Sequence, residues 1–279
     1  MRYADLHIHT TASDGVLTPE EVLKWAYKKG LKAISITDHD TISGMTKALS
    51  INRFIDLEIV PGIELNSEYL DEEIHVLGYY INYDNKSLLA KLKEIQQFRH
   101  DRAIKMIKNL KDLNMDISID EVKKISKGES IGRPHIAQAL INKGYSKDIK
   151  SAFRDYIGAG CPAYADRYKL STKQAIIMIN DAGGIPVLAH PGLLKNKSKL
   201  NDILNQGFSG IEVYHSKHDN ETVKSLKDIA GKKELIITGG SDCHGKLYNN
   251  EPILGTVTIN YNEFFLLKQF AQKKEKMKY

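Results

Sequence analysis

The fold is decided by residues 3–41, which read YADLHIHTTASDGVLTPEEVLKWAYKKGLKAISITDHDT. Apolar alternation over residues 3–10 predicts a strand. The TPEE segment at 18–21 predicts the start of a helix, with a Thr cap, a Pro in the first turn and a Glu three residues after the cap. Gly30 is typical of a helix end, and the apolar run at 31–37 predicts a second strand. This order predicts parallel strands with the helix packed on one face.

Most of the remaining chain continues this alternation. Further strands are expected at 57–65, 73–81, 185–191, 210–214, 235–245 and 252–259. Further helices are expected at 42–53, 172–182, 199–205 and 220–230, and from 262 onward. About seven or eight strands, with no glycine-rich dinucleotide fingerprint after the first, favour a closed α/β barrel over an open doubly wound sheet.

One stretch departs from the alternation. Residues 85–156 show helical periodicity only, as in the apolar stripe through Leu88 and Leu92. Ser118, with Glu121 three residues later, predicts the start of a second helix in this stretch. We therefore expect a small helical domain at 85–156, inserted into a barrel formed by 1–84 and 157–279.

Ionisable side chains gather where the predicted strands end, which is where α/β barrels carry their chemistry. His7 and His9 are two residues apart on one strand, so they point to the same side. The other residues at such positions are Asp38, His39, Asp40, Glu64, His75, His190, Asp242 and His244. A single strand-end histidine is usually an ordinary core or surface residue, but burying six of them unpaired beside carboxylates would be costly. Imidazole and carboxylate suit zinc, iron and manganese, so the pattern predicts a polynuclear metal site.

The composition is that of an ordinary globular protein. Of 279 residues, 42% are hydrophobic and 27% charged, which excludes a largely disordered chain. The formal net charge of +5 tolerates a polyanionic ligand without requiring one, and no DNA-binding motif is present. No apolar run approaches the roughly 18 residues of a membrane span, and no secretory signal is evident. With only Cys161 and Cys243, we expect a cytoplasmic protein without disulfides, and no obligate protein partner is implied.

Several motifs together resemble one known family. HIHTTASDGVLTPEE, SITDHDT, PGIEL, IHVLGY, LAHPG and GSDCHG, in this order, are similar to the polymerase and histidinol phosphatase (PHP) family. The resemblance covers nearly the whole chain, including the helical segment with its IGRPHIA motif. It implies a distorted (β/α)7 barrel, a helical insertion, and two to three divalent ions of manganese, iron or zinc.

The resemblance also implies how the ligands divide among the ions. One ion would be held by His7, His9, Glu64 and Asp242, a second by Glu64, His75 and His190, and a third by Asp14, His39 and His244. Without the resemblance, Asp14 would be an ordinary turn residue before Gly15. Asp5, Asp38 and Asp40 would orient ligand imidazoles, although Asp40 suits a helix cap equally well.

Such a site has a recognised chemistry. Two metal ions about 3.5–4 Å apart clamp a phosphate ester and lower the pKa of a bridging water, so a hydroxide attacks phosphorus without a Ser or Cys nucleophile. Glu64 is the expected bridging ligand and therefore the catalytic carboxylate.

A phosphate cradle should accompany the ions. The GRPH segment at 132–135 is the strongest candidate, because a helix start offers free N–H groups and Arg133 can grip phosphate bidentately. An ordinary capping turn with an exposed arginine is the alternative. Weaker candidates for substrate contact are His135, His215 and His218. Arg99 and Arg102 are expected on a solvated helix face.

These features predict a metal-dependent phosphoesterase acting on nucleotide phosphates. The resemblance implies removal of the 3′-phosphate from nucleoside 3′,5′-bisphosphates, or trimming of short 5′-phosphorylated RNA. One alternative is a histidinol-phosphate-type monoesterase, which the helical insertion argues against because it would wall in a nucleotide-sized cleft. An alternative of another class is a noncatalytic metal-bound module, which the intact ligand set argues against.

Overall fold

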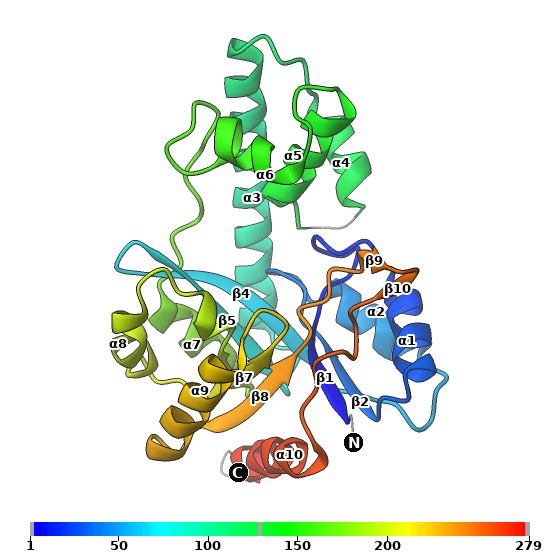
Figure 1. Ribbon diagram of the computed structural model, residues 1–279, viewed down its shortest axis with the longest axis vertical. Helices are drawn as coiled ribbons and strands as arrows, with labels where there is room; N and C mark the ends of the chain where they lie inside the picture. The colour runs from blue at the N-terminus through cyan, green and yellow to red at the C-terminus, as the bar shows by residue number, and fades with distance from the viewer. Residues whose placement is uncertain (1–2, 128–129, 277–279) are drawn as a thin grey trace.

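The computed structural model describes residues 3–127 and 130–276 and has a mixed α/β fold (Figure 1). The strands are β1 (Ala4–Ile8), β2 (Ala33–Ile36), β3 (Glu58–Ile59), β4 (Gly62–Tyr69), β5 (Glu72–Tyr79), β6 (Ile185–Leu188), β7 (Gly210–His215), β8 (Ile236–Gly240), β9 (Leu247–Tyr248) and β10 (Glu251–Pro252). The α-helices are α1 (Pro19–Lys28), α2 (Ser43–Ile51), α3 (Lys86–Asp112), α4 (Ile119–Ser126), α5 (Arg133–Asn142), α6 (Ile149–Ala152), α7 (Thr172–Asp181), α8 (Leu200–Leu204), α9 (Asn220–Lys232) and α10 (Tyr261–Lys276). There are also a π-helical turn at Phe153–Ile157 and 3₁₀ turns at Pro191–Leu193 and Lys197–Lys199.

Local helix signals in the sequence are confirmed at two helix starts. The Thr18 hydroxyl accepts a hydrogen bond from the N–H of Glu21, and the Glu21 carboxylate accepts one from the N–H of Thr18. Ser118 and Glu121 form the same reciprocal pair at the start of α4. Each pair satisfies two backbone donors that the helix itself leaves free, so both helices begin where the sequence predicts.

Two main sheets form the centre of the molecule. β1, β2 and β3 pair in parallel, as the strand–helix–strand order predicts. In the other sheet, β5 lies antiparallel between β4 and β6, and β6, β7 and β8 run parallel. Isolated bridges from Ile8 to Cys243 and from His39 to Glu64 join the sheets. The α/β class is confirmed, whereas a barrel with one continuous ladder is not seen in the described residues.

The Asp5 side chain explains why β1 and β8 lie side by side without a ladder between them. Its carboxylate accepts hydrogen bonds from the backbone N–H groups of His7, Ser241 and Gly255, at 3.3, 2.9 and 2.7 Å. Gly240 of β8 lies so close to β1 that a Cβ at this position would be 2.3 Å from the backbone nitrogen of His7. Asp5 therefore joins the two sheets through backbone donors, and no contact with a ligand imidazole is seen for it in the described part of the chain.

The closing strand predicted at 252–259 is mostly absent. Only Glu251–Pro252 is a strand, in a hairpin with β9, and a single bridge joins Ile259 to Ala4. Gly255 has a φ of +72°, in the left-handed region, and donates its N–H to a side chain rather than to a strand. The chain therefore turns at Gly255 instead of continuing along the sheet.

Buried hydrophobic side chains of the described residues form three clusters. The largest packs helices such as α1, α2 and α7 against the sheets. A second places Leu6, Leu77 and Tyr79 against Phe264 of α10. The third lies within the helical segment and contains side chains of α3, α4 and α5.

Helix α3 connects the sheets to the smaller helices (Figure 1). Its first half contributes Leu88 and Leu92 to the largest cluster, and its second half contributes Met106 and Leu110 to the helical cluster. The expected domain boundary at residue 85 therefore lies just before a helix that both parts share. No helix among the described residues is both long and apolar enough to cross a membrane.

Candidate metal centre

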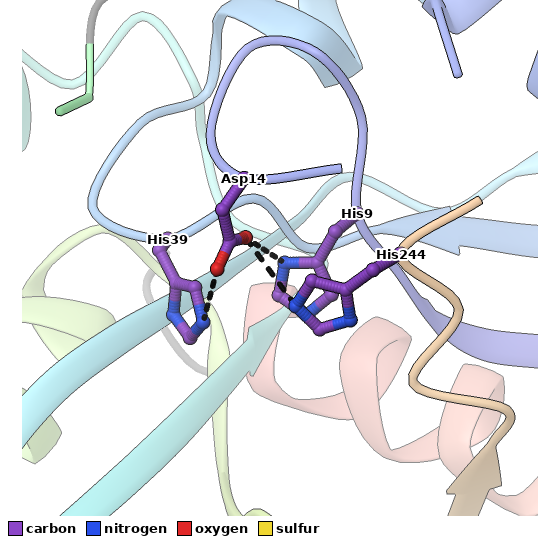
Figure 2. A group of neighbouring side chains, drawn as sticks. All are labelled: His9, Asp14, His39 and His244. Atoms are coloured by element: carbon purple, nitrogen blue, oxygen red, sulfur yellow. Dashed lines mark ion pairs between the residues drawn. The ribbon is translucent and has the colours of Figure 1, made fainter. Parts of the chain in front are cut away.

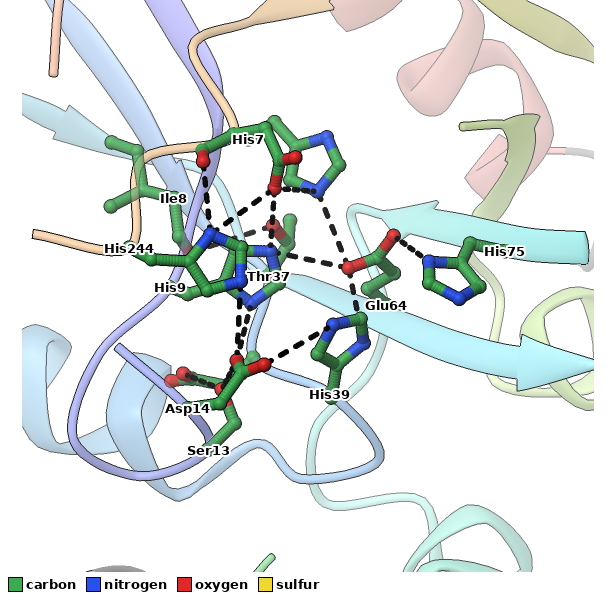
Figure 3. A network of polar contacts seen from close by, with 12 residues as sticks. His7, Ile8, His9, Ser13, Asp14, Thr37, His39, Glu64, His75 and His244 are labelled. Atoms are coloured by element: carbon green, nitrogen blue, oxygen red, sulfur yellow. Dashed lines mark hydrogen bonds and ion pairs between the residues drawn. The ribbon is translucent and has the colours of Figure 1, made fainter. Parts of the chain in front are cut away.

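The nine side chains expected to hold metal lie in one connected cluster where the two main sheets meet. Figure 3 labels all of them except His190 and Asp242. They are His7, His9 and Asp14 from β1 and the loop after it, His39 after β2, Glu64 on β4, His75 on β5, His190 after β6, and Asp242 and His244 after β8. Each has a ligand atom within 4.0 Å of another member. The strand-end positions that are far apart in sequence therefore converge.

Glu64 is the centre of this cluster. The side chains with a nitrogen within 3.3 Å of its carboxylate are His7, His9 and His39 at Oε2, and His75 and His190 at Oε1. The shortest separation is 2.9 Å, from Oε1 to Nδ1 of His75. A carboxylate with a different imidazole set on each oxygen has the arrangement of a bridging ligand.

Asp14 points into the cluster from the loop after β1 (Figure 2). Its Oδ1 lies 3.3 Å from Nε2 of His244 and 3.7 Å from Nδ1 of His9. Its Oδ2 lies 3.9 Å from Nε2 of His39. The four residues each offer one ligand atom, and these atoms lie within 4.8 Å of one another. Asp14 is therefore placed as a ligand would be, and not as an outward turn residue.

Two other groups satisfy the same distance condition. They are His7 with His9 and Asp242, and His39 with Glu64 and His75. The groups share members with one another, so this arrangement suits a site for several ions more than a single isolated one.

Several buried atoms of the cluster lack hydrogen-bond partners in the described residues. They are Nε2 of His7, both ring nitrogens of His9 and Oε2 of Glu64. A buried polar atom without a partner is costly, and native proteins rarely contain such atoms without a reason. A carboxylate oxygen and one nitrogen of each neutral imidazole are electron-pair donors of the type that zinc, iron and manganese accept, so the residues present fit metal ions.

The charges of the cluster also favour cations. Burial opposes ionisation of Glu64, but neighbouring imidazoles, led by His39, hold the pKa of this carboxyl well below its usual range. Burial likewise opposes a charge on His9, yet Asp242 and Glu64 raise its pKa to about 10. Burial lowers the pKa of His39 to about 4. The central carboxylate is therefore ionised at neutral pH and available to a metal ion.

Glu212 is a member of the site that the sequence analysis missed. Its Oε1 lies 2.9 Å from Nδ1 of His7, and its Oε2 accepts a hydrogen bond from the N–H of His190 at 2.7 Å. His190 has a φ of +29°, an unusual conformation for a residue with a side chain, and this hydrogen bond helps to hold it. Glu212 is fully buried in β7, and the one available signal was a lone Glu in an apolar strand, GIEVY.

Asp38 supports the loop that carries Asp14. Its Oδ1 accepts hydrogen bonds from the N–H of Thr10 and the hydroxyl of Ser13, at 2.7 and 2.6 Å. Its Oδ2 accepts from the Thr10 hydroxyl at 2.7 Å. Asp38 therefore orients a ligand-bearing loop, and not an imidazole as expected.

Asp40 reaches a ligand indirectly. It accepts hydrogen bonds from the backbone and side chain of Asn66, whose amide lies 3.2 Å from Nδ1 of His39. It also pairs with Arg99, whose Nε donates to Oδ2 at 2.8 Å. The cap of α2 is Ile42, which makes no side-chain cap, so the capping alternative for Asp40 does not apply.

The three histidines considered for substrate contact have partners within the protein. Nδ1 of His135 accepts from the N–H of Gly132 at the start of α5. Nε2 of buried His215 lies 3.2 Å from Oδ2 of Asp242. His218 is bonded at both ring nitrogens to backbone groups. None of these three residues lines the cavity described next.

A cavity of about 380 Å³ adjoins the cluster. Its lining includes three members of the cluster, Asp14, His39 and His75. It also includes five cationic side chains: Arg99, Arg102, Arg133, Arg167 and Lys195. The Arg133 guanidinium lies 5.1 Å from the ring centre of Phe153 and 3.8 Å from Glu73. Arg99 and Arg102 thus differ from the expectation of a solvated face, because both line the cavity: Arg99 pairs with Asp40, and Arg102 donates to the carbonyl oxygen of Ala165.

Known proteins resemble this chain over most of its length. The model of the PHP domain family matches residues 5–161. A phosphoribosyl 1,2-cyclic phosphate 1,2-diphosphodiesterase of Eggerthella lenta is 28% identical over 87% of this chain and 94% of the relative. A 3′,5′-nucleoside bisphosphate phosphatase of Chromobacterium violaceum is 30% identical, with 88% of both chains covered. The 5′-3′ exoribonuclease Rnm of Escherichia coli is 29% identical, with 86% of this chain and 84% of the relative covered.

A solved structure resembles the whole fold. A Bifidobacterium adolescentis protein described as a metal-dependent phosphoesterase superposes with a TM-score of 0.85 and 30% identity, and 95% of each chain is covered. The family resemblance inferred from the motifs is therefore confirmed.

Proposed function

Because the chain belongs to the PHP domain family and is a metal-dependent phosphoesterase, we propose that it hydrolyses phosphate esters of nucleotides. The bond proposed for cleavage is the 3′-phosphate ester of nucleoside 3′,5′-bisphosphates, with short 5′-phosphorylated RNA as a second substrate. The observation that carries this proposal is Glu64, whose carboxylate lies within 3.3 Å of five imidazoles. Two of these, His39 and His75, line a cavity that arginines also line. Similarity to a nucleoside bisphosphate phosphatase and to an exoribonuclease supports it.

The same nine side chains are proposed to hold two to three divalent ions of manganese, iron or zinc. Bound ions of this kind polarise a phosphoryl group and lower the pKa of water. The protein contributes the arrangement: Glu64 serves both sets of imidazoles, and Glu212 fixes which nitrogen of His7 faces the cluster.

The architecture proposed for this function is the distorted seven-stranded barrel of the family, in which the two main sheets act as one wall around the site. Residues 85–156 form its helical insertion. Support comes from the side chains at the cavity, since Arg99 and Arg133 reach it from this segment. With the helical insertion on its border, the cavity can enclose a substrate larger than a simple phosphate monoester.

Arg133 is proposed to contact substrate phosphate, whereas His135, His215 and His218 act through their neighbours. A guanidinium that lines the cavity can donate two parallel hydrogen bonds to phosphate. The His135 cap positions the turn that presents Arg133, and His215 orients Asp242.

A substrate panel tests this proposal. Metal-replete protein is assayed on adenosine 3′,5′-bisphosphate, adenosine 3′-monophosphate, short 5′-phosphorylated RNA and histidinol phosphate. We expect the highest kcat/KM on the bisphosphate. Fastest turnover of histidinol phosphate, or no turnover of any ester, would contradict the proposal.

A second candidate function is hydrolysis of a phosphoribosyl 1,2-cyclic phosphate. It is favoured by the similarity to the Eggerthella lenta diphosphodiesterase, of which this chain covers 94%. The cyclic ester is added to the panel as a fifth substrate, and a higher kcat/KM on it than on the bisphosphate would select the second candidate.

A further inference from the structure

The cations around the cavity differ in how far their charge is already compensated. Arg99 pairs with Asp40, and Arg167 pairs with Glu68 and Glu73. Arg133 shares Glu73 with Arg167, at 3.8 Å. These carboxylates offset part of the positive charge that a ligand would otherwise meet.

Arg102 is the exception among the cavity arginines. It is only partly exposed, and it forms no ion pair with any carboxylate of the described residues. Its Nε donates a hydrogen bond to the carbonyl oxygen of Ala165 at 2.8 Å, and its guanidinium lies 5.6 Å from the ring centre of Tyr164. These contacts hold the side chain in place, while its two terminal nitrogens donate to no described residue.

The electrostatic surroundings of Arg102 also favour a bound anion. Burial, together with the positive charges of Arg133 and Arg99, lowers the pKa of this guanidinium to about 10. A positive charge held near other positive charges in a partly buried place gains more from a bound anion than an exposed arginine does.

We propose that Arg102 is the principal residue of a second anion subsite, which binds the phosphate that is not cleaved. This inference rests on the proposed function, because the other phosphate is assigned to the Glu64 cluster. The two subsites border one cavity of about 380 Å³, a size typical of small-ligand pockets, because His39 and His75 of the cluster line it together with Arg102. Arg133 assists, but Glu73 offsets part of its charge. A nucleoside with phosphates at both ends of its ribose therefore matches the cavity better than a monophosphate.

The experiment compares Arg102→Gln, Arg102→Lys and wild type on adenosine 3′,5′-bisphosphate and adenosine 3′-monophosphate. Gln removes the charge but keeps an amide donor for Ala165, and Lys keeps the charge without the bidentate geometry. The matched control is Arg154→Gln, because Arg154 lies in the same helical segment but is exposed and paired with Asp155. Thermal unfolding of each variant reports whether the fold survives.

We expect the ratio of kcat/KM between bisphosphate and monophosphate to fall roughly 10- to 150-fold in Arg102→Gln, mainly through KM, as for loss of one charge-assisted hydrogen-bonded contact. Arg102→Lys should recover part of this ratio, and Arg154→Gln should keep the wild-type ratio. Equal losses on both substrates, or an unchanged ratio in Arg102→Gln, would overturn the inference.

Failure of the proposed function is separable from failure of this subsite. If wild-type protein hydrolyses neither nucleotide, the proposed function fails, and calorimetric titration with adenosine 3′,5′-bisphosphate decides the subsite. The dissociation constant should then rise at least about 10-fold in Arg102→Gln. An unchanged constant would remove Arg102 from anion binding.

Discussion

The cluster around Glu64 and the helical wall, which is the part of the cavity lining formed by Arg99, Arg102 and Arg133, differ in the charge that they attract. In the cluster, buried carboxylates and imidazoles face one another, and several of their atoms lack partners. In the wall, arginines project into the cavity, and only Arg102 has no carboxylate partner among the described residues. The cluster therefore suits a cation and the wall suits an anion. A phosphate ester bound between them would satisfy both.

The largest effect should come from removing the divalent ions proposed for the cluster. We expect two to three divalent ions per chain by elemental analysis of metal-replete protein, and loss of hydrolysis after treatment with a chelator. The buried nitrogens of His7 and His9 have no hydrogen-bond partner, so removing the metal ions would leave them without any ligand. The thermal midpoint of unfolding should therefore fall as well. One ion or none per chain would contradict the proposed difference between the cluster and the helical wall, since the cluster would then be an ordinary buried ion-pair network.

Glu64→Gln should have the next largest effect. The neutral amide cannot supply the charge that faces both imidazole sets, so kcat should drop roughly 10²- to 10³-fold. Glu58→Gln is the matched control, because Glu58 pairs with Lys268 away from the cluster. Turnover like that of wild type in Glu64→Gln, with normal metal content, would show that Glu64 is not the bridge.

Glu212→Gln tests whether metal binding by the cluster depends on the hydrogen bonds that Glu212 forms with His7 and His190. The amide cannot accept from both the His7 ring and the His190 backbone as the carboxylate does, so metal affinity should fall about 10- to 100-fold. Metal titration monitored by calorimetry measures this directly, and added metal should restore most of the activity. If metal affinity does not change, Glu212 serves packing only.

The smallest effect is expected on the helical wall, from Arg133→Ala. Because binding of phosphate competes with the Glu73 pair, kcat/KM on adenosine 3′,5′-bisphosphate should fall only about 3- to 10-fold. The loss should be smaller than that of Arg102→Gln measured in parallel. The reverse order would transfer the principal role in the anion subsite to Arg133.

The sequence was more informative for the cluster than for the wall. His7 and His9 are adjacent on one face because a strand has a two-residue period, and that period is local. Strand ends in an α/β fold meet at one edge, so His39, Glu64 and Asp242 could be placed together without coordinates. Asp14 needed the family resemblance, because an Asp before a Gly is typical of ordinary turns.

The helical wall could not be read in the same way. Arg99 and Arg102 lie on a long helix with many charged neighbours, where helical spacing alone does not separate a solvated face from a cavity wall. The histidines differed in the opposite direction. His135 and His218 were expected to contact substrate, but their ring nitrogens form hydrogen bonds with backbone groups of the protein. Which face of a helix meets a distant sheet depends on packing between remote segments.

The sequence by itself determined the α/β class, the helix starts at Thr18 and Ser118, and most of the residues that form the cluster. These properties follow from short-range periodicity, capping and chain order. Only the tertiary structure decided that Asp5 replaces a ladder between β1 and β8, and that Glu212 supports both His7 and His190. It also decided that Arg102 lines the cavity without an ion pair to any carboxylate of the described residues. Each of these depends on contacts between segments tens to hundreds of residues apart, and local sequence carries no record of which distant backbone a side chain will meet.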